Sequence, residues 1–151
     1  MRPSEAHWRQ DAEWALEYLK GTRHVAAGTI VLDGTGLGAD LALEVAATHP
    51  ELAGVIAESP TAEPLNPIFD DPRARLVPAR LLVRDRYDLD AAAGAVRVPV
   101  LWLEQPMQDE KSRAYAQVAA RKMIVWLNPE GDTNEQFQDA MERWLDELTV
   151  R

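Results

Sequence analysis

The chain has 151 residues, of which 46% are hydrophobic, and this length suits one globular domain that buries about two thirds of its unfolded surface. Its net charge of −9, from 25 acidic and 16 basic residues, argues against nucleic acid or an anionic membrane as a partner. The absence of cysteine excludes disulfides, thiolate metal sites and a cysteine nucleophile. The polar N-terminus does not resemble a signal peptide, and no apolar run approaches the roughly 20 residues that span a bilayer, so we expect a cytoplasmic protein.

The first segment predicts an amphipathic helix, with Ser4 as its N-cap and Gly21 at its end. Its apolar residues recur with a helical period at Trp8, Ala12, Ala15, Leu16 and Leu19. Trp8 and Trp14 fall on different sides of this helix, so we expect one of them to be exposed. An exposed tryptophan suggests contact with a partner.

A βαβ unit follows the helix. The stretches "GTIVL" at 28–32 and "AGVIAE" at 53–58 are short, apolar and rich in β-branched residues, which is typical of buried strands. Between them, 37–48 has alanine-rich helical spacing. Residues 59–97 then hold five of the ten prolines, and we predict a loop with a helix near 73–85 that forms a flap at the carboxyl ends of the strands.

The last third predicts a second pair of strands. "VPVLWLE" at 98–104 and "KMIVWL" at 122–127 bracket a helix at about 110–121, and their tryptophans, Trp102 and Trp126, are expected in the core.

A helix at about 134–148 closes the chain, with Thr133 and Gln136 as a capping box. Strands that alternate with helices imply a parallel sheet that is covered on both faces. We therefore predict one α/β domain over 1–151, with three α/β/α layers and about four parallel strands in sequential order.

The glycine-rich turn within "VLDGTGLGADLAL", residues 31–43, allows two interpretations. As a dinucleotide-binding fingerprint, Gly34, Gly36 and Ala39 match G-x-G-x-x-G/A after a strand, and Glu58 ends the next strand about 20 residues later. Against this interpretation, a full helix precedes the strand, and the proline-rich segment that starts at Pro60 interrupts the βαβ succession.

The second interpretation is a G-x-S-x-G nucleophile elbow in the frame 34–38. The stretches that support it are "LEYLK" before the strand, "LALEVAATHPELAGVIAESP" after it, "RDRYDLDAAAGAVRVPVLWLEQ" later and the C-terminal "WLDEL". With these stretches, nearly the whole chain resembles the carboxyl-terminal half of an α/β-hydrolase of the small bacterial esterase-like kind. The stretches are scaffold, and scaffold similarity carries no chemistry by itself.

The resemblance implies a site whose reactive groups are missing. Gly36 stands where the family has its serine, and only the backbone N–H of Leu37 remains of the oxyanion hole. Asp109, beside Gln108, is the candidate for the family's acid, although a carboxylate that starts a helix is more often a charge favoured by the helix dipole. The family's histidine would follow the last strand, where the chain has "NPEGDTNEQF", and all three histidines lie upstream: His7, His24 and His49.

Other nucleophiles have little support. Thr35 and Ser59 are candidates by position, but no histidine or lysine is predicted beside them to activate a hydroxyl. A carboxylate mechanism that uses Asp33, Asp109 or Asp132 needs two acids at a fixed separation. In a chain with 25 acidic residues such pairs are expected by chance, so they are no evidence for this mechanism. We therefore predict no catalytic residue, no metal and no cofactor. The remnant elbow and the strand ends are the predicted binding residues, namely Gly34, Thr35, Gly36, Leu37, Ser59 and Asp109.

These observations predict a catalytically degenerate α/β-hydrolase-like domain that acts in binding or assembly. Because the family's earlier strands are absent, the strand edge at 28–33 is left open, and residues 29–32 carry no lysine or proline to guard it. We expect a homodimer or a partner protein to pair there. The alternatives are an esterase-like hydrolase completed by a partner chain or by unusual residues, and a nucleotide-binding protein that uses the glycine turn.

Overall fold

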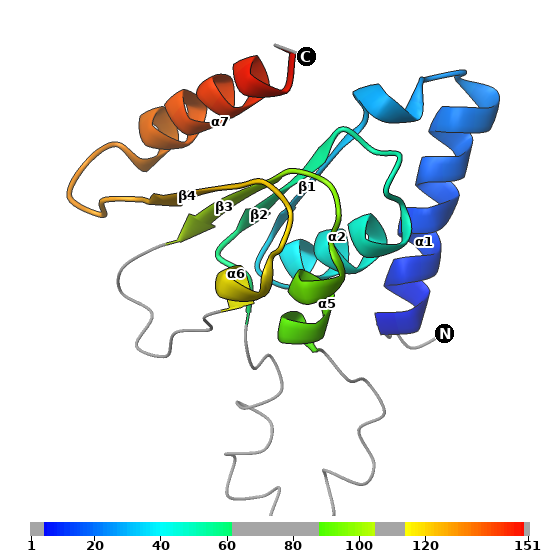
Figure 1. The fold of residues 1–151 in the computed structure, drawn as a ribbon, viewed down its shortest axis with the longest axis horizontal. Helices are drawn as coiled ribbons and strands as arrows, with labels where there is room; N and C mark the ends of the chain where they lie inside the picture. Colours follow the sequence, from blue (N-terminus) through cyan, green and yellow to red (C-terminus); the bar gives the residue numbers. More distant parts are fainter. Residues whose placement is uncertain (1–4, 62–87, 105–113, 150–151) are drawn as a thin grey trace, which may run out of the picture.

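A computed structural model describes residues 5–61, 88–104 and 114–149 (Figure 1). Its centre is a four-stranded parallel sheet in the order β1-β2-β3-β4, so the predicted sequential order is confirmed. The strands are β1 (Val31–Thr35), β2 (Gly54–Glu58), β3 (Val100–Glu104) and β4 (Lys122–Trp126). The α-helices are α1 (Glu5–Glu17), α2 (Leu37–Thr48), α5 (Leu89–Ala95), α6 (Ala114–Gln117) and α7 (Thr133–Thr149).

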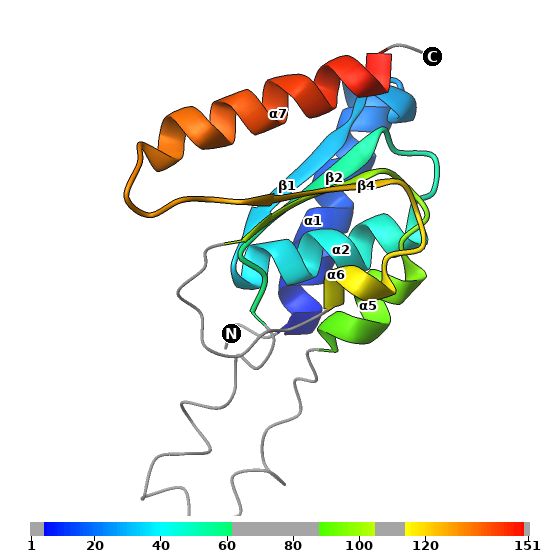
Figure 2. The same ribbon diagram turned by 60° about the vertical axis from the view of Figure 1, so that its left-hand side comes forward.

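Helices cover both faces of the sheet, which gives the predicted three layers (Figure 2). Helix α7 lies on one face, and α2, α5 and α6 lie on the other. Successive residues of a strand point to opposite faces, so each central strand contributes to two cores. On β3, Trp102 packs with Leu43 of α2 in one core, while Leu101 and Leu103 pack with Trp144 of α7 in the other.

Parallel pairing brings the carboxyl ends of all four strands to one edge of the sheet. Thr35 pairs with Glu58, Glu58 pairs with Leu103, and Glu104 pairs with Trp126. The turn from β1 to α2 lies at this edge. None of the described helices is long and apolar enough to cross a membrane.

The first strand begins later than predicted. Ala27–Thr29 forms a 3-10 turn, in which the backbone N–H of Ile30 donates to the carbonyl of Ala27. The Thr29 hydroxyl donates to the carbonyl of Ala26 and also favours the turn. Strand β1 then runs from Val31 to Thr35, where it follows the register of β2. The open edge is therefore 31–35 rather than 28–33, and it extends to Thr35.

The predicted first helix is confirmed, but it does not end at Gly21. Helix α1 continues into a π-helical turn, Tyr18–Thr22, which closes where the N–H of Arg23 donates to the carbonyl of Tyr18. Trp8 and Trp14 are both exposed, at 41% and 63%. The predicted N-cap, Ser4, lies outside the described residues.

The segment between β2 and β3 holds a helix that we did not predict. Helix α5 begins after Asp88, whose side chain accepts a 2.9 Å hydrogen bond from the N–H of Ala91. The helix predicted at 73–85 lies outside the described residues, as does most of the flap. The helix predicted at about 110–121 ends earlier than expected, because α6 stops at Gln117. Beyond it, the Lys122 ammonium donates hydrogen bonds to the carbonyls of Tyr115 and Val118.

Two predictions near the C-terminus are wrong, the capping box of Thr133 and Gln136 and the burial of Trp126. Asp132, not Thr133, caps α7, because its Oδ1 accepts hydrogen bonds from the N–H groups of Asn134 and Glu135, at 2.9 Å and 3.2 Å. The Gln136 side chain instead binds the backbone of Asn128.

Trp126 is 54% exposed, because β4 is the outermost strand on the other side of the described sheet. Trp102, on a central strand, is buried as predicted.

Candidate functional site

The turn between β1 and α2 is a sharp bend in the backbone at Gly36. This residue has φ 58° and ψ −122°, a conformation that L side chains rarely adopt. Its N–H donates to the carbonyl of Glu58 at 2.9 Å, and its own carbonyl accepts from the N–H of Ala39 at 3.0 Å. The bend is thus tied both to the neighbouring strand and to the first turn of the helix.

Gly34 is required by close backbone contact and Gly36 by backbone conformation. A Cβ at Gly34 would overlap the carbonyl oxygen of Gly38, so strand and helix could not approach as they do. A Cβ at Gly36 would meet only the Thr61 hydroxyl, at 3.6 Å. There is therefore room for a side chain at Gly36, and the site lacks one.

The two candidate hydroxyls at the strand ends lie in different environments. The Thr35 hydroxyl is exposed and donates a 3.0 Å hydrogen bond to Oε2 of Glu58, on the adjacent strand. Ser59 has φ 45°, and its N–H donates to the carbonyl of Leu103 at 2.7 Å. The Ser59 Oγ is buried and has no hydrogen-bond partner among the residues described. Asp109, the remaining predicted acid, lies outside the described residues.

Two buried acids at this end of the sheet were not predicted from the sequence. Asp40, in the first turn of α2, is 3% exposed, and its Oδ1 accepts a 3.0 Å hydrogen bond from the N–H of Thr61. Burial raises the pKa of Asp40 to about 7, the hydrogen bond from Thr61 opposes the rise, and the Glu44 carboxylate adds to it. Burial also raises the pKa of Glu104, against an opposing interaction with the Trp102 side chain. The available signal for Asp40 was a charge among the alanine and leucine residues of α2.

Comparisons with known proteins identify the architecture. No family model matches the chain, and no curated protein matches it. Among solved structures, it is similar to an α/β hydrolase from Vibrio vulnificus, with a TM-score of 0.72 and 17% identity over 95% of this chain and 57% of the other.

It is also similar to two acetyl xylan esterases, at 18% identity each. The match to acetyl xylan esterase 1 from Thermoanaerobacterium sp. JW/SL YS485 has a TM-score of 0.64 and covers 94% of this chain and 52% of that one. The match to the Paenibacillus sp. R4 enzyme has a TM-score of 0.66 and covers 91% and 51%. The chain has an α/β-hydrolase-like fold. It spans about half the length of these three proteins.

In this α/β-hydrolase-like chain, His49 lies away from the glycine turn and contacts two carboxylates. It follows α2, at the end opposite to the glycine turn, and its ring nitrogens lie 2.7 Å from Oε2 of Glu13 and 3.0 Å from Oε1 of Glu51. Burial lowers its pKa, but the two carboxylates outweigh burial and leave the pKa raised. Within the described ranges, no group of three or more histidine or acidic side chains could hold a metal ion.

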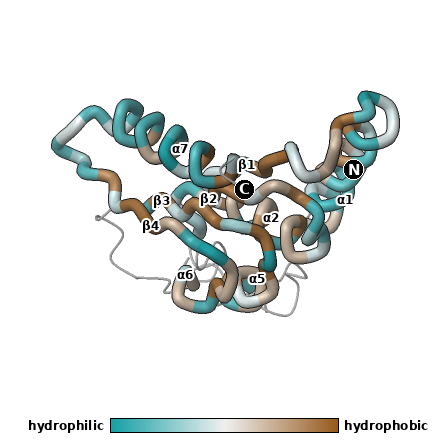
Figure 3. Tube along the Cα trace, turned by 45° about the horizontal axis from the view of Figure 1, so that its top comes forward, coloured by the Kyte–Doolittle hydropathy of each residue, from teal (hydrophilic) through white to brown (hydrophobic). Residues whose placement is uncertain are grey.

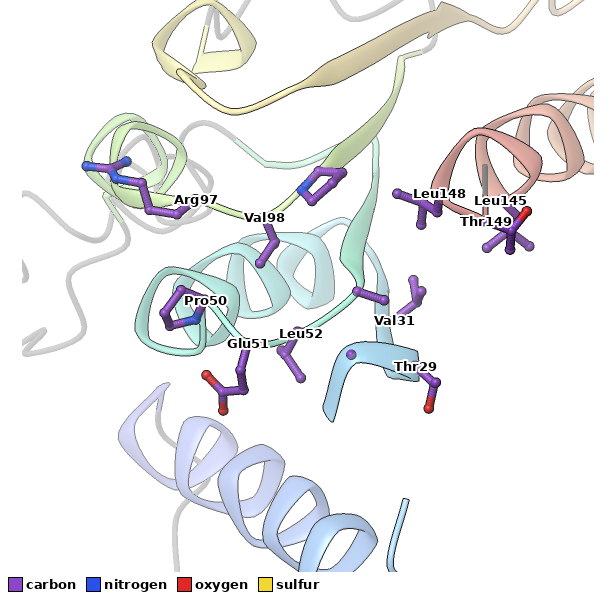
Figure 4. Close-up of a pocket in the computed structure, with 13 residues that line it drawn as sticks. Thr29, Val31, Pro50, Glu51, Leu52, Arg97, Val98, Leu145, Leu148 and Thr149 are labelled. Atoms are coloured by element: carbon purple, nitrogen blue, oxygen red, sulfur yellow. The ribbon is translucent and has the colours of Figure 1, made fainter. Parts of the chain in front are cut away.

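The α/β-hydrolase-like chain also has a hollow at the opposite, amino-terminal end of its sheet (Figure 4). Its volume is about 640 Å³. Thr29 and Val31 line one side, Leu145 and Leu148 of α7 face them, and the loops before β2 and β3 complete the wall. The hollow is thus separate from the glycine turn and lies beside the start of the open strand β1.

Proposed function

We propose that this chain is a non-hydrolytic α/β-hydrolase-like domain that acts in binding or assembly through the open edge of β1. The observation that carries the proposal is Gly36. The backbone there has the sharp strand-to-helix bend of an elbow, there is space for a side chain, and the residue has none. A serine hydrolase needs a nucleophilic oxygen at that position and a base beside it.

Assembly is supported by the state of the sheet. Strand β1 pairs only with β2 among the described strands, so the N–H and C=O groups along its other side are available to another strand. The chain spans about half the length of the three hydrolases and esterases it resembles. A second copy of the chain or a partner protein would satisfy these groups.

A hydrolase with unusual residues is the second candidate, and the pair of Thr35 and Glu58 favours it. The 3.0 Å hydrogen bond places a carboxylate where a base would activate the hydroxyl. A carboxylate is a far weaker base than imidazole near neutral pH, so this pair supports at most slow turnover.

Nucleotide binding at the glycine turn is the third candidate and has less support. The N-terminus of α2 would attract a phosphate, but Glu58 lies at the end of the adjacent strand, where its negative charge would oppose phosphate binding.

Activity assays on the purified chain test the proposal. We expect no labelling by a fluorophosphonate probe and no turnover of p-nitrophenyl acetate or butyrate, with the Paenibacillus sp. R4 acetyl xylan esterase as the positive control. Stoichiometric labelling would contradict the proposal. If turnover is found, Thr35→Ala decides between the hydrolase candidates, since only the unusual-residue mechanism loses its activity. A thermal shift with NAD or FAD would favour nucleotide binding.

A further inference from the structure

Helix α1 is attached to the domain by few buried side chains. It packs on α2 and lies at one side of the molecule, away from α7 (Figures 1 and 3). Over residues 6–17, Leu16 is the only buried side chain, and Ala12 and Glu13 are half-buried. Leu16 and Ala12 pack in the core beside α2. Contacts between polar side chains therefore contribute a large share of what holds this helix in place.

These polar contacts meet at His49, in the loop between α2 and β2. Its Nε2 lies 2.7 Å from Oε2 of Glu13 on α1, and its Nδ1 lies 3.0 Å from Oε1 of Glu51 in the same loop. Lys20, in the turn after α1, adds a second link, because its Nζ lies 3.3 Å from the same oxygen of Glu51. The Nζ of Lys20 also lies 2.9 Å from Oε1 of Glu17. Both links join α1 and its following turn to the loop before β2.

The two contacts of His49 specify how many protons its ring carries. A neutral imidazole has one N–H and one lone pair, whereas an imidazolium has two N–H groups. Both ring nitrogens lie against carboxylates, and an ionised carboxylate accepts hydrogen bonds but cannot donate them. The backbone N–H of Glu51 and the His49 ring lower the pKa of the Glu51 carboxyl to about 2, so it is ionised. The ring can donate to both carboxylates at once only as an imidazolium.

The charged groups around His49 favour this form. Glu13 faces the ring from α1, Glu51 faces it from the loop, and Lys20 reaches Glu51 from the turn after α1. Arg97, before β3, lines the hollow beside Glu51, but its guanidinium donates to carbonyl groups at the end of α5. Burial lowers the pKa of His49, and the two carboxylates outweigh burial, so the pKa lies above its ordinary value of 6.5.

From these contacts, we infer that His49 forms a pH-dependent link that holds α1 against the loop before β2. This inference goes beyond the proposed function, because it requires neither hydrolysis nor a partner. When the ring carries both protons, it donates to α1 and to its own loop. When one proton leaves, one ring nitrogen presents a lone pair to a carboxylate, and that contact becomes repulsive. The link is therefore complete below pH 6.5 and is lost as the pH rises through the higher pKa of the folded protein.

Nuclear magnetic resonance of the histidine rings tests the protonation state. The ¹⁵N shifts distinguish a ring with two N–H groups from a ring with one, and His49→Gln assigns the signal by removing it. We expect His49 to carry both protons at pH 6 and to titrate with a midpoint above 6.5. Glu13→Gln should lower the midpoint by about 0.5–1 pH unit, because it removes one carboxylate and keeps the side-chain length. Asp11→Asn, at an exposed acid of α1, should leave it unchanged.

Amide hydrogen exchange measures how firmly α1 is held. Protection factors, which correct for the intrinsic effect of pH on exchange, are compared between α1 and α7 at pH 6 and pH 9. We expect the ratio of α1 to α7 protection to fall about fivefold from pH 6 to pH 9 in the wild type. His49→Arg should keep the high ratio at both pH values, because its guanidinium stays charged, and His49→Gln should give the low ratio at both. Lys20 keeps its charge over this range, because the hydrogen bond with Glu17 raises its pKa above 10.5.

Three results would each overturn the inference. They are a His49 midpoint at or below 6.5, a midpoint that Glu13→Gln leaves unchanged, and a wild-type ratio that falls no more than the ratio of His49→Gln. Thermal unfolding at both pH values shows whether each variant is folded. If His49→Arg does not fold, Glu13→Gln and His49→Gln still decide the outcome. Since these measurements do not involve hydrolysis or a partner, failure here would leave the proposed function unaffected.

Discussion

Asp40 is the most buried acid of the site, and replacing it by asparagine removes its titrating carboxyl group. Asparagine keeps the oxygen that accepts the hydrogen bond from the N–H of Thr61, and it has nearly the same shape. It introduces a buried N–H donor, but the native carboxyl carries a comparable O–H donor when it is protonated. The substitution therefore changes mainly the response of stability to pH.

The magnitude follows from the pKa in the two states. The pKa of Asp40 rises from 3.8 in the unfolded chain to about 7 in the folded one. The folded protein therefore binds the proton more tightly, so this contribution to stability is fully present below pH 3.8 and is lost as pH rises through about 7. The loss approaches about 1.4 kcal/mol per pH unit between the two pKa values and comes to about 2.6 kcal/mol from pH 5 to pH 8. Screening by solvent around the carboxyl reduces the expected loss to about 1.5 kcal/mol.

Urea unfolding at pH 5 and pH 8 measures this effect. We expect the wild type to lose about 1.5 kcal/mol more than Asp40→Asn over this range. Glu104 and His49, whose pKa values are also raised, titrate in both proteins and cancel in the comparison. Asp139→Asn, at an exposed acid, should behave like the wild type. If the wild type and Asp40→Asn change in parallel within about 0.5 kcal/mol, Asp40 is ionised in the folded protein at pH 5, and the reasoning from burial is refuted.

Three further predictions concern the turn and the core. Gly36→Ser should leave p-nitrophenyl acetate turnover at background, because it adds a hydroxyl without a base; a large rise in kcat would reveal a base that we have missed. Gly34→Ala should lower the free energy of unfolding by about 3 kcal/mol, because its Cβ meets the backbone of Gly38, whereas Gly21→Ala, with open space, should change it by less than about 1 kcal/mol; equal effects in urea unfolding would contradict the packing argument. Trp144→Ala should cost about 3–5 kcal/mol and Trp126→Ala less than about 1 kcal/mol in the same assay, and the reverse order would mean that β4 is not an edge strand.

Local sequence patterns predicted most of the architecture. The alanine-rich period over 37–48 matches α2, and four apolar stretches match four parallel strands in sequential order. The glycine pattern predicted the sharp turn, because only a residue without Cβ allows the close approach at Gly34. These features depend on neighbours along the chain, which a pattern of a few residues records.

The tertiary structure decided what depends on neighbours in space. Trp126 and Trp102 lie in similar apolar stretches, yet one is exposed and the other buried, because β4 is an outer strand and β3 is central. Pairing with β2 sets the bounds of β1 and so includes Gly34 and Thr35 in the open edge. The pKa of Asp40 likewise depends on burial, which raises it, and on the N–H of Thr61, 21 residues further along the chain, which opposes the rise. Burial, strand pairing and the electrostatic surroundings of a side chain depend on contacts between segments that are distant in the sequence. A pattern of a few neighbouring residues does not record these contacts.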